Sequence, residues 1–413
     1  MSEVNSTKLR KDADCIVKSA IEAVQPDAAV RRALEHKEFN GKIILVAIGK
    51  AAWQMAKAAS DVLGKRIDNG VVVTKYDHVM GEIMNCTCYE AGHPVPDENS
   101  FMGTKAAIDA VTGLSKDDTV LFLISGGGSA LFEKPYVSGD ELQDITSQLL
   151  ASGADIVEMN TIRKRLSAVK GGRFAKLCEP ASVYAIVLSD ILGDPLDMIA
   201  SGPACPDTST CKEAVAIAKK YHLKLSETAK ELLTKETPKT LDNVETTING
   251  SVRELCMAAA NECRKLGYEP MILTDELCCQ AKEAGSFLAS IIRTHRNDGK
   301  KFAFIAGGET VVKLTGTGKG GRNQELALAA TQGIAGLNAC VFSVGSDGTD
   351  GPTDAAGGYV DGNTLERLKN KGINVTTVLS NNDAYHALKE VDGLIVTGPT
   401  GTNVNDVSVA LIG

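Results

Sequence analysis

Short apolar runs alternate with helix-like stretches along most of this 413-residue chain, and the alternation restricts the fold more than any other feature. Residues 42–48, 119–124 and 182–188 are nearly continuous apolar runs, as expected of strands that are buried on both faces. Stretches with helical periodicity follow at 140–151 and 160–177. Strands that alternate with helices predict parallel βαβ units, so we expect an α/β fold with a doubly wound sheet.

A polar segment interrupts the pattern and predicts a domain junction. Residues 236–250 read ETPKTLDNVETTING, and helix–strand alternation resumes after them. The chain length also favours two or three domains. Near the end, the runs GLIVTG and DVSVALI predict a terminal hairpin across the turn PTGTN.

Composition narrows the class of protein. The net charge of −8 and the pI of about 5.4 argue against a surface for nucleic acids or anionic membranes. No apolar stretch approaches the roughly 20 residues of a membrane span, and the first residues lack the apolar core of a signal peptide. We therefore expect a cytoplasmic protein, a monomer or a homodimer, whose eleven cysteines are reduced core residues rather than zinc ligands.

Two turns in the first half of the chain predict phosphate binding. Gly49 and Lys50 follow the run 42–48 at the start of a helix, where free N–H groups and a lysine charge favour an anion. The run 119–124 leads into Ser125-Gly126-Gly127-Gly128-Ser129. Three glycines let the backbone approach an anion closely, and the serines can donate hydrogen bonds.

A basic segment follows the second turn. It contains Arg163, Lys164, Arg165, Lys170 and Arg173 in an otherwise acidic protein. We assign Lys170 to the cofactor site, whereas a solvated helix face is the stronger interpretation of Lys164 and Arg173. No aromatic residues interleave the segment for base stacking. Asn160 is a possible N-cap of the helix that carries it.

Two aspartates follow the run 182–188. Asp190 lies at the predicted strand end and Asp194 four residues later. Carboxylates beside a phosphate site can hold Mg²⁺, or one can accept a proton from an attacking hydroxyl. Capping and turn roles are the plain alternatives, and Asp190 is the stronger functional candidate. The proline-framed loop around His93 could contact a ligand or serve structure alone.

The second half supplies an arginine among glycine turns. GTGKGG, residues 316–321, leads into Arg322 at a predicted helix start, and Asp347 closes a further strand. A guanidinium can hold a carboxylate bidentately or stabilise a phosphoryl group in transfer. GTGKGG superficially matches GxGxxG but lacks the setting of a dinucleotide fingerprint.

The sequence also resembles the class II glycerate kinases, the glycerate 2-kinase or MOFRL-containing family. The resemblance rests on AIGKAAWQMAKAA, AGHPVPDENS, LFLISGGGSALF, NTIRKRLSAVKGGRFA, LSDILGDPLDMIASGPACPD, GGETVVKLTGTGKGGRNQELALA, SVGSDGTDGPTDAAGG and TGPTGTNVNDV, which cover nearly the whole chain in order.

This resemblance implies an N-terminal Rossmann-like domain, residues 1–240, and a smaller C-terminal α/β domain of MOFRL type, residues 241–413, with the active site in the cleft between them. It implies ATP- and Mg²⁺-dependent phosphorylation of D-glycerate, usually to 2-phosphoglycerate. The family's principal active-site lysine and arginine correspond to Lys50 and Arg322.

The resulting hypothesis assigns each group a role. Lys50, Arg322 and Asp190 are the catalytic candidates. Residues 125–129 and Lys170 bind the nucleotide, Asp190 and Asp194 hold the metal, and Lys50, Arg322 and Asp347 bind substrate. The alternatives are 3-phosphoglycerate as product, an NAD(P)-dependent hydroxypyruvate reductase, and a non-catalytic sensor of nucleotides or sugar acids.

Overall fold

The computed structural model describes residues 3–413, and the chain divides into two compact units. Pro26–Asn249 form one, which we call the central unit. Gly250–Gly413 and the residues up to Gln25 form the other, which we call the terminal unit. The predicted domain of residues 1–240 includes the first 25 residues, whereas in the structure these belong with the C-terminal part of the chain.

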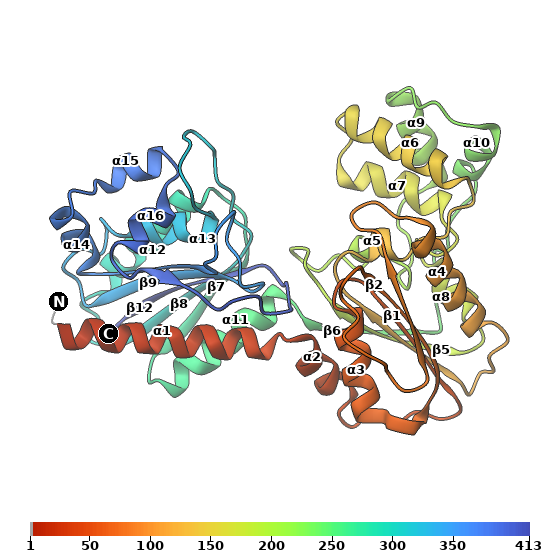
Figure 1. Ribbon diagram of the computed structural model, residues 1–413, viewed down its shortest axis with the longest axis horizontal. Helices are drawn as coiled ribbons and strands as arrows, with labels where there is room; N and C mark the ends of the chain where they lie inside the picture. Colours follow the sequence, from red (N-terminus) through yellow and green to blue (C-terminus); the bar gives the residue numbers. More distant parts are fainter. Residues whose placement is uncertain (1–2) are drawn as a thin grey trace. The chain divides into compact units, whose positions relative to one another are not determined.

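The central unit is built on one six-stranded sheet (Figure 1). Its strands are β1 (Ile43–Ile48), β2 (Ile67–Lys75), β3 (Cys86–Ala91), β4 (Thr119–Ile124), β5 (Ser182–Leu188) and β6 (Val244–Gly250). Their order is β3-β2-β1-β4-β5-β6, and the pairs from β3 through β5 are parallel. This is the doubly wound order of a Rossmann-like sheet, in which the order reverses between β1 and β4.

Helices cover both faces of the central sheet. Alternate residues of β1 enter different cores: Ile44 and Val46 pack on the side of α4 (Glu98–Val111), and Ile43 and Leu45 on the side of α2 (Pro26–Leu34) and α3 (Ala52–Leu63). Every residue of β1 and β4 is buried, because a strand with two covered faces has no solvent side. The predicted doubly wound α/β fold is confirmed.

The remaining helices of the central unit follow β4 and β5. They are α5 (Gly128–Leu131), α6 (Gly139–Ala151), α7 (Ile156–Leu166), α8 (Arg173–Leu177), α9 (Cys211–Lys220) and α10 (Glu227–Leu233), with short 3₁₀ turns at Gly64–Arg66 and Ile199–Ser201. α6, α7, α9 and α10 gather into a cluster with its own apolar core (Figure 1). The helix predicted at 160–177 is therefore two helices, separated by a turn in which Gly171 and Gly172 have positive φ.

The terminal unit has a mixed six-stranded sheet. Its strands are β7 (Glu269–Leu277), β8 (Phe302–Gly308), β9 (Ala339–Gly345), β10 (Gly357–Asp361), β11 (Leu394–Ile395) and β12 (Asp406–Ile412), in the order β11-β10-β9-β12-β8-β7. Only β7 and β8 pair in parallel among these strands. The predicted terminal hairpin is wrong, because β10 and β9 lie between β11 and β12.

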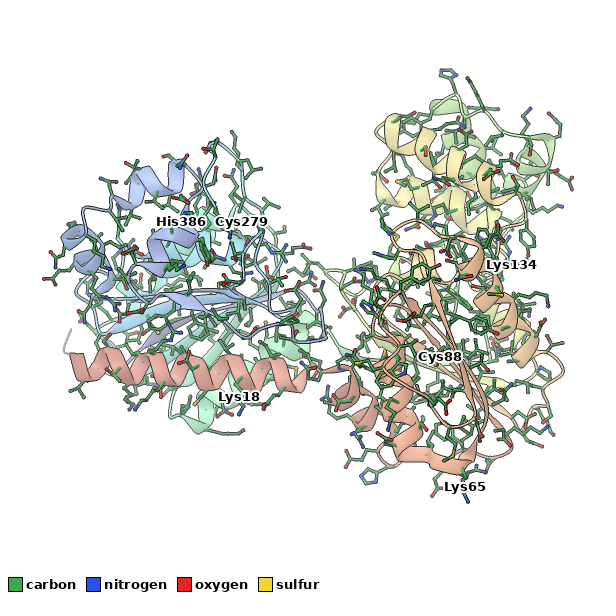
Figure 2. All side chains as sticks on the ribbon, viewed as in Figure 1. Lys18, Lys65, Cys88, Lys134, Cys279 and His386 are labelled. Carbon is green, nitrogen blue, oxygen red and sulfur yellow. The ribbon has the colours of Figure 1, made fainter. Side chains whose placement is uncertain are left out.

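Helices cover both faces of this sheet as well (Figure 1). They are α1 (Glu3–Ala23), α11 (Val252–Lys265), α12 (Ala281–His295), α13 (Arg322–Ala330), α14 (Thr364–Asn370), α15 (Val375–Ser380) and α16 (Ala384–Lys389). α1 buries Leu9, Ala13 and Ile16, while Lys18 lies on its exposed side, away from the sheet (Figure 2). This apolar stripe explains why the first residues belong to the terminal unit.

Candidate active site

The turn after β1 brings a lysine to the carboxyl edge of the central sheet. Gly49 has a φ of 108°, and a Cβ there would lie 2.3 Å from the Ser125 hydroxyl oxygen. Glycine thus lets the ends of β1 and β4 meet. The Lys50 N–H donates to the Gly126 carbonyl at 2.9 Å, and the Lys50 side chain is exposed. These residues lie where the strand order reverses, the position at which open α/β sheets bind ligands.

The two serines of the loop after β4 make bonds within the protein. Ser125 is buried, and its hydroxyl donates to the Ile48 carbonyl at 3.2 Å and accepts from the Ala51 N–H at 3.1 Å. Ser129 is half-buried, and its hydroxyl lies 3.1 Å from that of Ser201. Ser125 therefore ties β4 to the turn after β1, while Gly126 and Gly127 are half-buried and Gly128 is buried.

Each of the first two glycines is required by a close neighbour. A Cβ on Gly126 would lie 2.2 Å from Asp190 Oδ2. Gly127 has a φ of 86°, and its Cβ would lie 3.1 Å from both Lys50 Cγ and His93 Cδ2. The loop therefore brings Lys50, His93 and Asp190, from three separate segments, against two consecutive residues.

Lys170 lies beneath the loop rather than at its surface. Its side chain is fully buried, and Nζ donates to the carbonyls of Ser129 at 2.8 Å and Phe132 at 3.0 Å. The equally buried Glu133 lies 3.2 Å away, and burial lowers the pKa of Lys170 to about 8. Arg163 also donates to the Ser129 carbonyl, at 2.9 Å. The predicted direct contact of Lys170 with a nucleotide would need an exposed ammonium, so we assign it to supporting the loop.

The basic segment is an internal network and not a solvated helix face. Lys164 is buried and lies 3.1 Å from Asp207, and Arg165 is fully buried beside the same carboxylate. The solvated interpretation of Lys164 is therefore wrong. The N-cap of α7 is Asp155, which forms a capping box, whereas Asn160 is buried inside the helix. Sequence alone does not reveal these pairs, because Asp207 lies 43 residues after Lys164.

Asp190 and Asp194 occupy the loop after β5. Both are half-buried, and Asp190 contacts the loop glycine as described above. Asp194 has a φ of 50°, and its Oδ1 is buried without a hydrogen-bond partner among the described residues. Residues 3–413 contain no group of three or more His, Cys, Asp or Glu side chains arranged to hold a metal.

His93 belongs to the same edge, although the sequence leaves its role open. It is half-buried at the end of β3, next to Pro94 in a cis peptide bond. Burial lowers the pKa of His93, and the charges of Lys50 and Lys75 lower it further. The imidazole is therefore neutral at pH 7 and can both donate and accept a hydrogen bond.

In the terminal unit, two carboxylates hold Arg322 at the first turn of α13. Nε and Nη2 donate to the two oxygens of Asp406 at 2.6 and 3.0 Å, and Nη1 donates to Glu309 at 2.8 Å. Burial disfavours the charge of Arg322, but the hydrogen bonds that it donates to Asp406 outweigh burial and raise the pKa of Arg322. Asp406 and Glu309 come from the start of β12 and the end of β8. No sequence motif marked either as a partner of Arg322.

Two further aspartates lie around Arg322. Asp350 is buried, and its oxygens accept the N–H groups of Asn323 at 3.1 Å and Gln324 at 2.8 Å. Burial raises its pKa to about 7. This carboxylate therefore occupies two of the N–H groups in the first turn of α13. The predicted Asp347 reaches the same area, because a Cβ on Gly345 would approach both Asp347 and Asp406.

The glycine run before Arg322 packs against protein. The N–H groups of Thr315 and Gly316 donate to the Asn382 side chain, and that of Thr317 donates to the Asn381 side chain. A Cβ on Gly316 would lie 2.4 Å from the Asn381 Cα. These glycines permit close packing of two loops, and the bonded N–H groups are unavailable to a pyrophosphate. The loop is therefore not a preformed dinucleotide cradle.

Comparison with known proteins identifies the family. Residues 12–234 match the model of a domain of unknown function, DUF4147, and residues 302–406 match the MOFRL family. A D-glycerate 2-kinase from Thermotoga maritima is 54% identical over 411 residues, which cover 98% of each chain. The chain belongs to the glycerate kinase family. The expected resemblance is confirmed.

A crystal structure of glycerate kinase from Thermotoga maritima has the same fold. It superposes with a TM-score of 0.95 at 52% identity and covers 98% of this chain and all of that one. A relative from Agrobacterium vitis is named a putative hydroxypyruvate reductase and is 38% identical, covering 99% of this chain and 96% of that protein. None of the helices in residues 3–413 has the length and apolar character needed to cross a bilayer.

Proposed function

We propose that the protein phosphorylates D-glycerate with ATP, giving 2-phosphoglycerate and ADP in the cytoplasm. The observation that carries this proposal is the convergence of Lys50, Asp190 and two close-packed glycines where the strand order of the central sheet reverses. Phosphoryl transfer needs positioning and charge neutralisation more than covalent chemistry, and these groups supply both. The names of the most similar relatives support glycerate as the substrate.

In this proposal, Lys50 and the glycines bind the phosphates of ATP. The Lys50 side chain is exposed, and its Cγ lies against Gly127. Ser125 and Lys170 fix the two ends of the loop from below, so the loop is already ordered before the nucleotide arrives. Preorganised donors stabilise transferring charge without the cost of reorganisation.

The residues fit a magnesium ion that arrives with ATP. Asp190 places an oxygen beside Gly126, and Asp194 has a buried oxygen without a partner among the described residues. Mg²⁺ typically takes one or two carboxylates and completes its shell with water and phosphate oxygens. When bound, it would neutralise charge on the phosphates. Asp190 would hold it, with Asp194 as a second ligand.

Arg322 is the proposed partner of the glycerate carboxylate or of the transferring phosphoryl group. Asp406 occupies one edge of the guanidinium, and the side chain keeps about a third of its surface exposed. The remaining donors can form a bidentate contact with an anion. Asp347 is the proposed partner of a substrate hydroxyl, since a Cβ on Gly345 would lie 3.1 Å from Asp347 Oδ1 and 3.4 Å from Asp406 Oδ1.

The decisive experiment follows the product by ³¹P NMR after the protein is mixed with ATP, Mg²⁺ and D-glycerate. We expect the signal of 2-phosphoglycerate. A signal of 3-phosphoglycerate would support kinase activity but would contradict phosphorylation at the 2-hydroxyl. A small displacement of the bound triose changes which hydroxyl attacks. Absence of any phosphoglycerate across several divalent metals would refute the proposal.

The name of the Agrobacterium vitis relative makes reduction of hydroxypyruvate the second candidate. The same protein mixed with hydroxypyruvate and NADH or NADPH distinguishes the two, because oxidation of the cofactor lowers absorbance at 340 nm. We expect no change, since the glycine run that could mimic a dinucleotide site is bonded to Asn381 and Asn382.

A further inference from the structure

The position of His93 is set by the fold and not by a free loop. Asp97, the N-cap of α4, accepts hydrogen bonds from Ser100 of its own helix and from the Tyr76 hydroxyl at 2.7 Å. The same carboxylate accepts from Gly92, and a Cβ on Gly92 would lie 2.6 Å from the Val95 carbonyl oxygen. Gly92, the residue before His93, is thus tied to the N-cap of α4, and that N-cap is tied to Tyr76 directly after β2.

The imidazole is directed at the reactive part of the proposed site. His93 Nε2 would lie 3.2 Å from a Cβ on Gly127, and Lys50 Cγ would lie 3.1 Å from the same atom. The adjacent residue, Gly126, touches Asp190. A phosphoryl group bound over these glycines by Lys50 would therefore have the imidazole on one side and the Asp190 carboxylate nearby.

The charges around His93 keep a lone pair available. Lys50 reaches it from the turn after β1 and Lys75 from the end of β2, and both lower the pKa of His93, as burial does. Asp190 is the acidic group at the same edge. The lysines oppose protonation, so the imidazole is in the form that accepts a proton.

Metal preference separates the two candidate proton acceptors. Mg²⁺ is a hard cation that takes oxygen ligands, so it would engage the carboxylates of Asp190 and Asp194 rather than an imidazole. A carboxylate bound to a cation is a weaker base than a free one. The imidazole of His93 would not bind the Mg²⁺, so its basicity would not be reduced in this way. Histidine is the commonest general base in enzymes.

We propose that His93 Nε2 accepts the proton of the glycerate hydroxyl that attacks ATP, a step that rests on the proposed kinase function. The hydroxyl O–H bond breaks and its oxygen forms a bond to the γ-phosphorus. The bond from that phosphorus to the bridging oxygen breaks, and ADP leaves with the electron pair. The proton on His93 then passes to solvent, so that atoms and charge balance.

The first test compares His93→Gln with His36→Asn. Glutamine keeps a hydrogen-bonding group near Nε2 but takes up no proton at neutral pH, whereas His36 is an exposed histidine between α2 and β1. We expect kcat of His93→Gln to fall roughly 10²- to 10⁴-fold, the usual contribution of general base catalysis, and KM for glycerate to change less than about threefold. His36→Asn keeps wild-type values.

The second test uses pH. Wild-type kcat should fall as pH drops through the pKa of His93, which lies below the ordinary histidine value of about 6.5, because the protonated ring cannot accept a proton. Lys75→Met removes one opposing charge, so it should raise that pKa and move the acid limb to higher pH. The His93 ring signal in an NMR titration reports the same shift without any activity.

The outcomes separate the two proposals. A wild-type protein that forms no phosphoglycerate would refute the kinase itself. An active wild type with His93→Gln retaining kcat within threefold, or keeping the same acid limb, would overturn only the role of His93. If His93→Gln unfolds, the milder His93→Asn and imidazole added to His93→Ala decide the matter, because rescue by free imidazole supports a proton acceptor and its failure opposes one.

Discussion

Asp406 accepts two hydrogen bonds from one edge of the Arg322 guanidinium. Arg322 Nε lies 2.6 Å from Asp406 Oδ2, and Arg322 Nη2 lies 3.0 Å from Asp406 Oδ1. The Asp406 side chain is 6% exposed, whereas that of Glu309, the other partner, is 48% exposed. Asp406 is thus the more buried of the two partners of Arg322, and Glu309 is the more exposed one.

Asp406→Asn should therefore weaken the handling of glycerate. The amide offers one acceptor oxygen in place of two, so one charge-assisted bond is lost. Such a bond contributes about 1.5–3 kcal/mol, which corresponds to a roughly 10- to 100-fold loss of kcat/KM. Steady-state kinetics measure it, with the exposed Asp392→Asn as control. Unchanged kinetic constants would contradict a role of Asp406 in positioning Arg322.

Lys50→Met tests the phosphate contact. Loss of the only charge at the turn after β1 should lower kcat/KM for ATP at least about 100-fold, since Lys50 would stabilise charge that grows in the transition state. Lys57→Met, on the exposed side of α3 beside Asp61, is the matched control. Near-normal turnover in Lys50→Met would contradict the proposed site.

Gly127→Ala tests whether Gly127 is needed for activity or only for the backbone conformation of its turn. Its φ of 86° makes any side chain costly by about 1–2 kcal/mol, and the new Cβ would meet Lys50 and His93. Gly113→Ala is the matched control, because Gly113 has a φ of 78° and nothing within 4 Å of its Cβ position. Both variants should lose similar stability in urea unfolding, but only Gly127→Ala should lose activity. Equal activities would show that the glycine serves the turn alone.

Lys170 and Glu133 form a buried ion pair whose halves depend on each other. Lys170→Met leaves the Glu133 carboxylate uncompensated, so unfolding free energy should fall by about 3–5 kcal/mol. Adding Glu133→Gln should restore part of this loss, because no buried charge then remains. Denaturant unfolding of the two single variants and the double variant measures the coupling. Additive losses would argue against a paired role.

Asp350 gives the terminal unit a pH dependence. Its folded pKa of about 7 lies above the unfolded value of about 3.9, so the folded state binds the proton more tightly. Stability from this group is full below pH 4 and is lost as pH rises to 7. Between pH 5 and pH 8, wild type should lose about 2–3 kcal/mol relative to Asp350→Asn. Urea unfolding at both pH values tests this, and parallel curves would contradict it.

The sequence predicts the central sheet well, because strands buried on both faces leave continuous apolar runs such as 43–48. It misses β3 and β6, whose half-exposed residues lack that signature. The hairpin prediction failed because proximity in sequence says little about strand order in a mixed sheet. The glycine turns were recognisable, whereas the partners of Lys170 and Arg322 were not, because tertiary contacts bring them together.

Residues that approach the loop from distant segments illustrate the same limit. His93 sits in a recognisable proline-framed loop, but its closeness to Gly127 follows from the pairing of β3 with β2 and of β2 with β1. Asp406 lies in the motif TGPTGTNVNDV, but nothing in that motif marks it as a partner of Arg322. Catalytic candidates that begin helices can be found from motifs, while residues that orient them require the fold.

The placement of α1 determines which fragments of the protein contain a whole unit. In the sequence, the central unit is one continuous segment between the two stretches that form the terminal unit. A fragment of residues 26–249 therefore contains the whole central unit. A fragment that begins at residue 250 lacks α1 and would leave uncovered the apolar surface on which Leu9, Ala13 and Ile16 pack. Joining residues 1–25 to residue 250 through a short linker should restore it. The terminal unit is therefore one fold built from two separate stretches of chain, with the central unit inserted between them in the sequence.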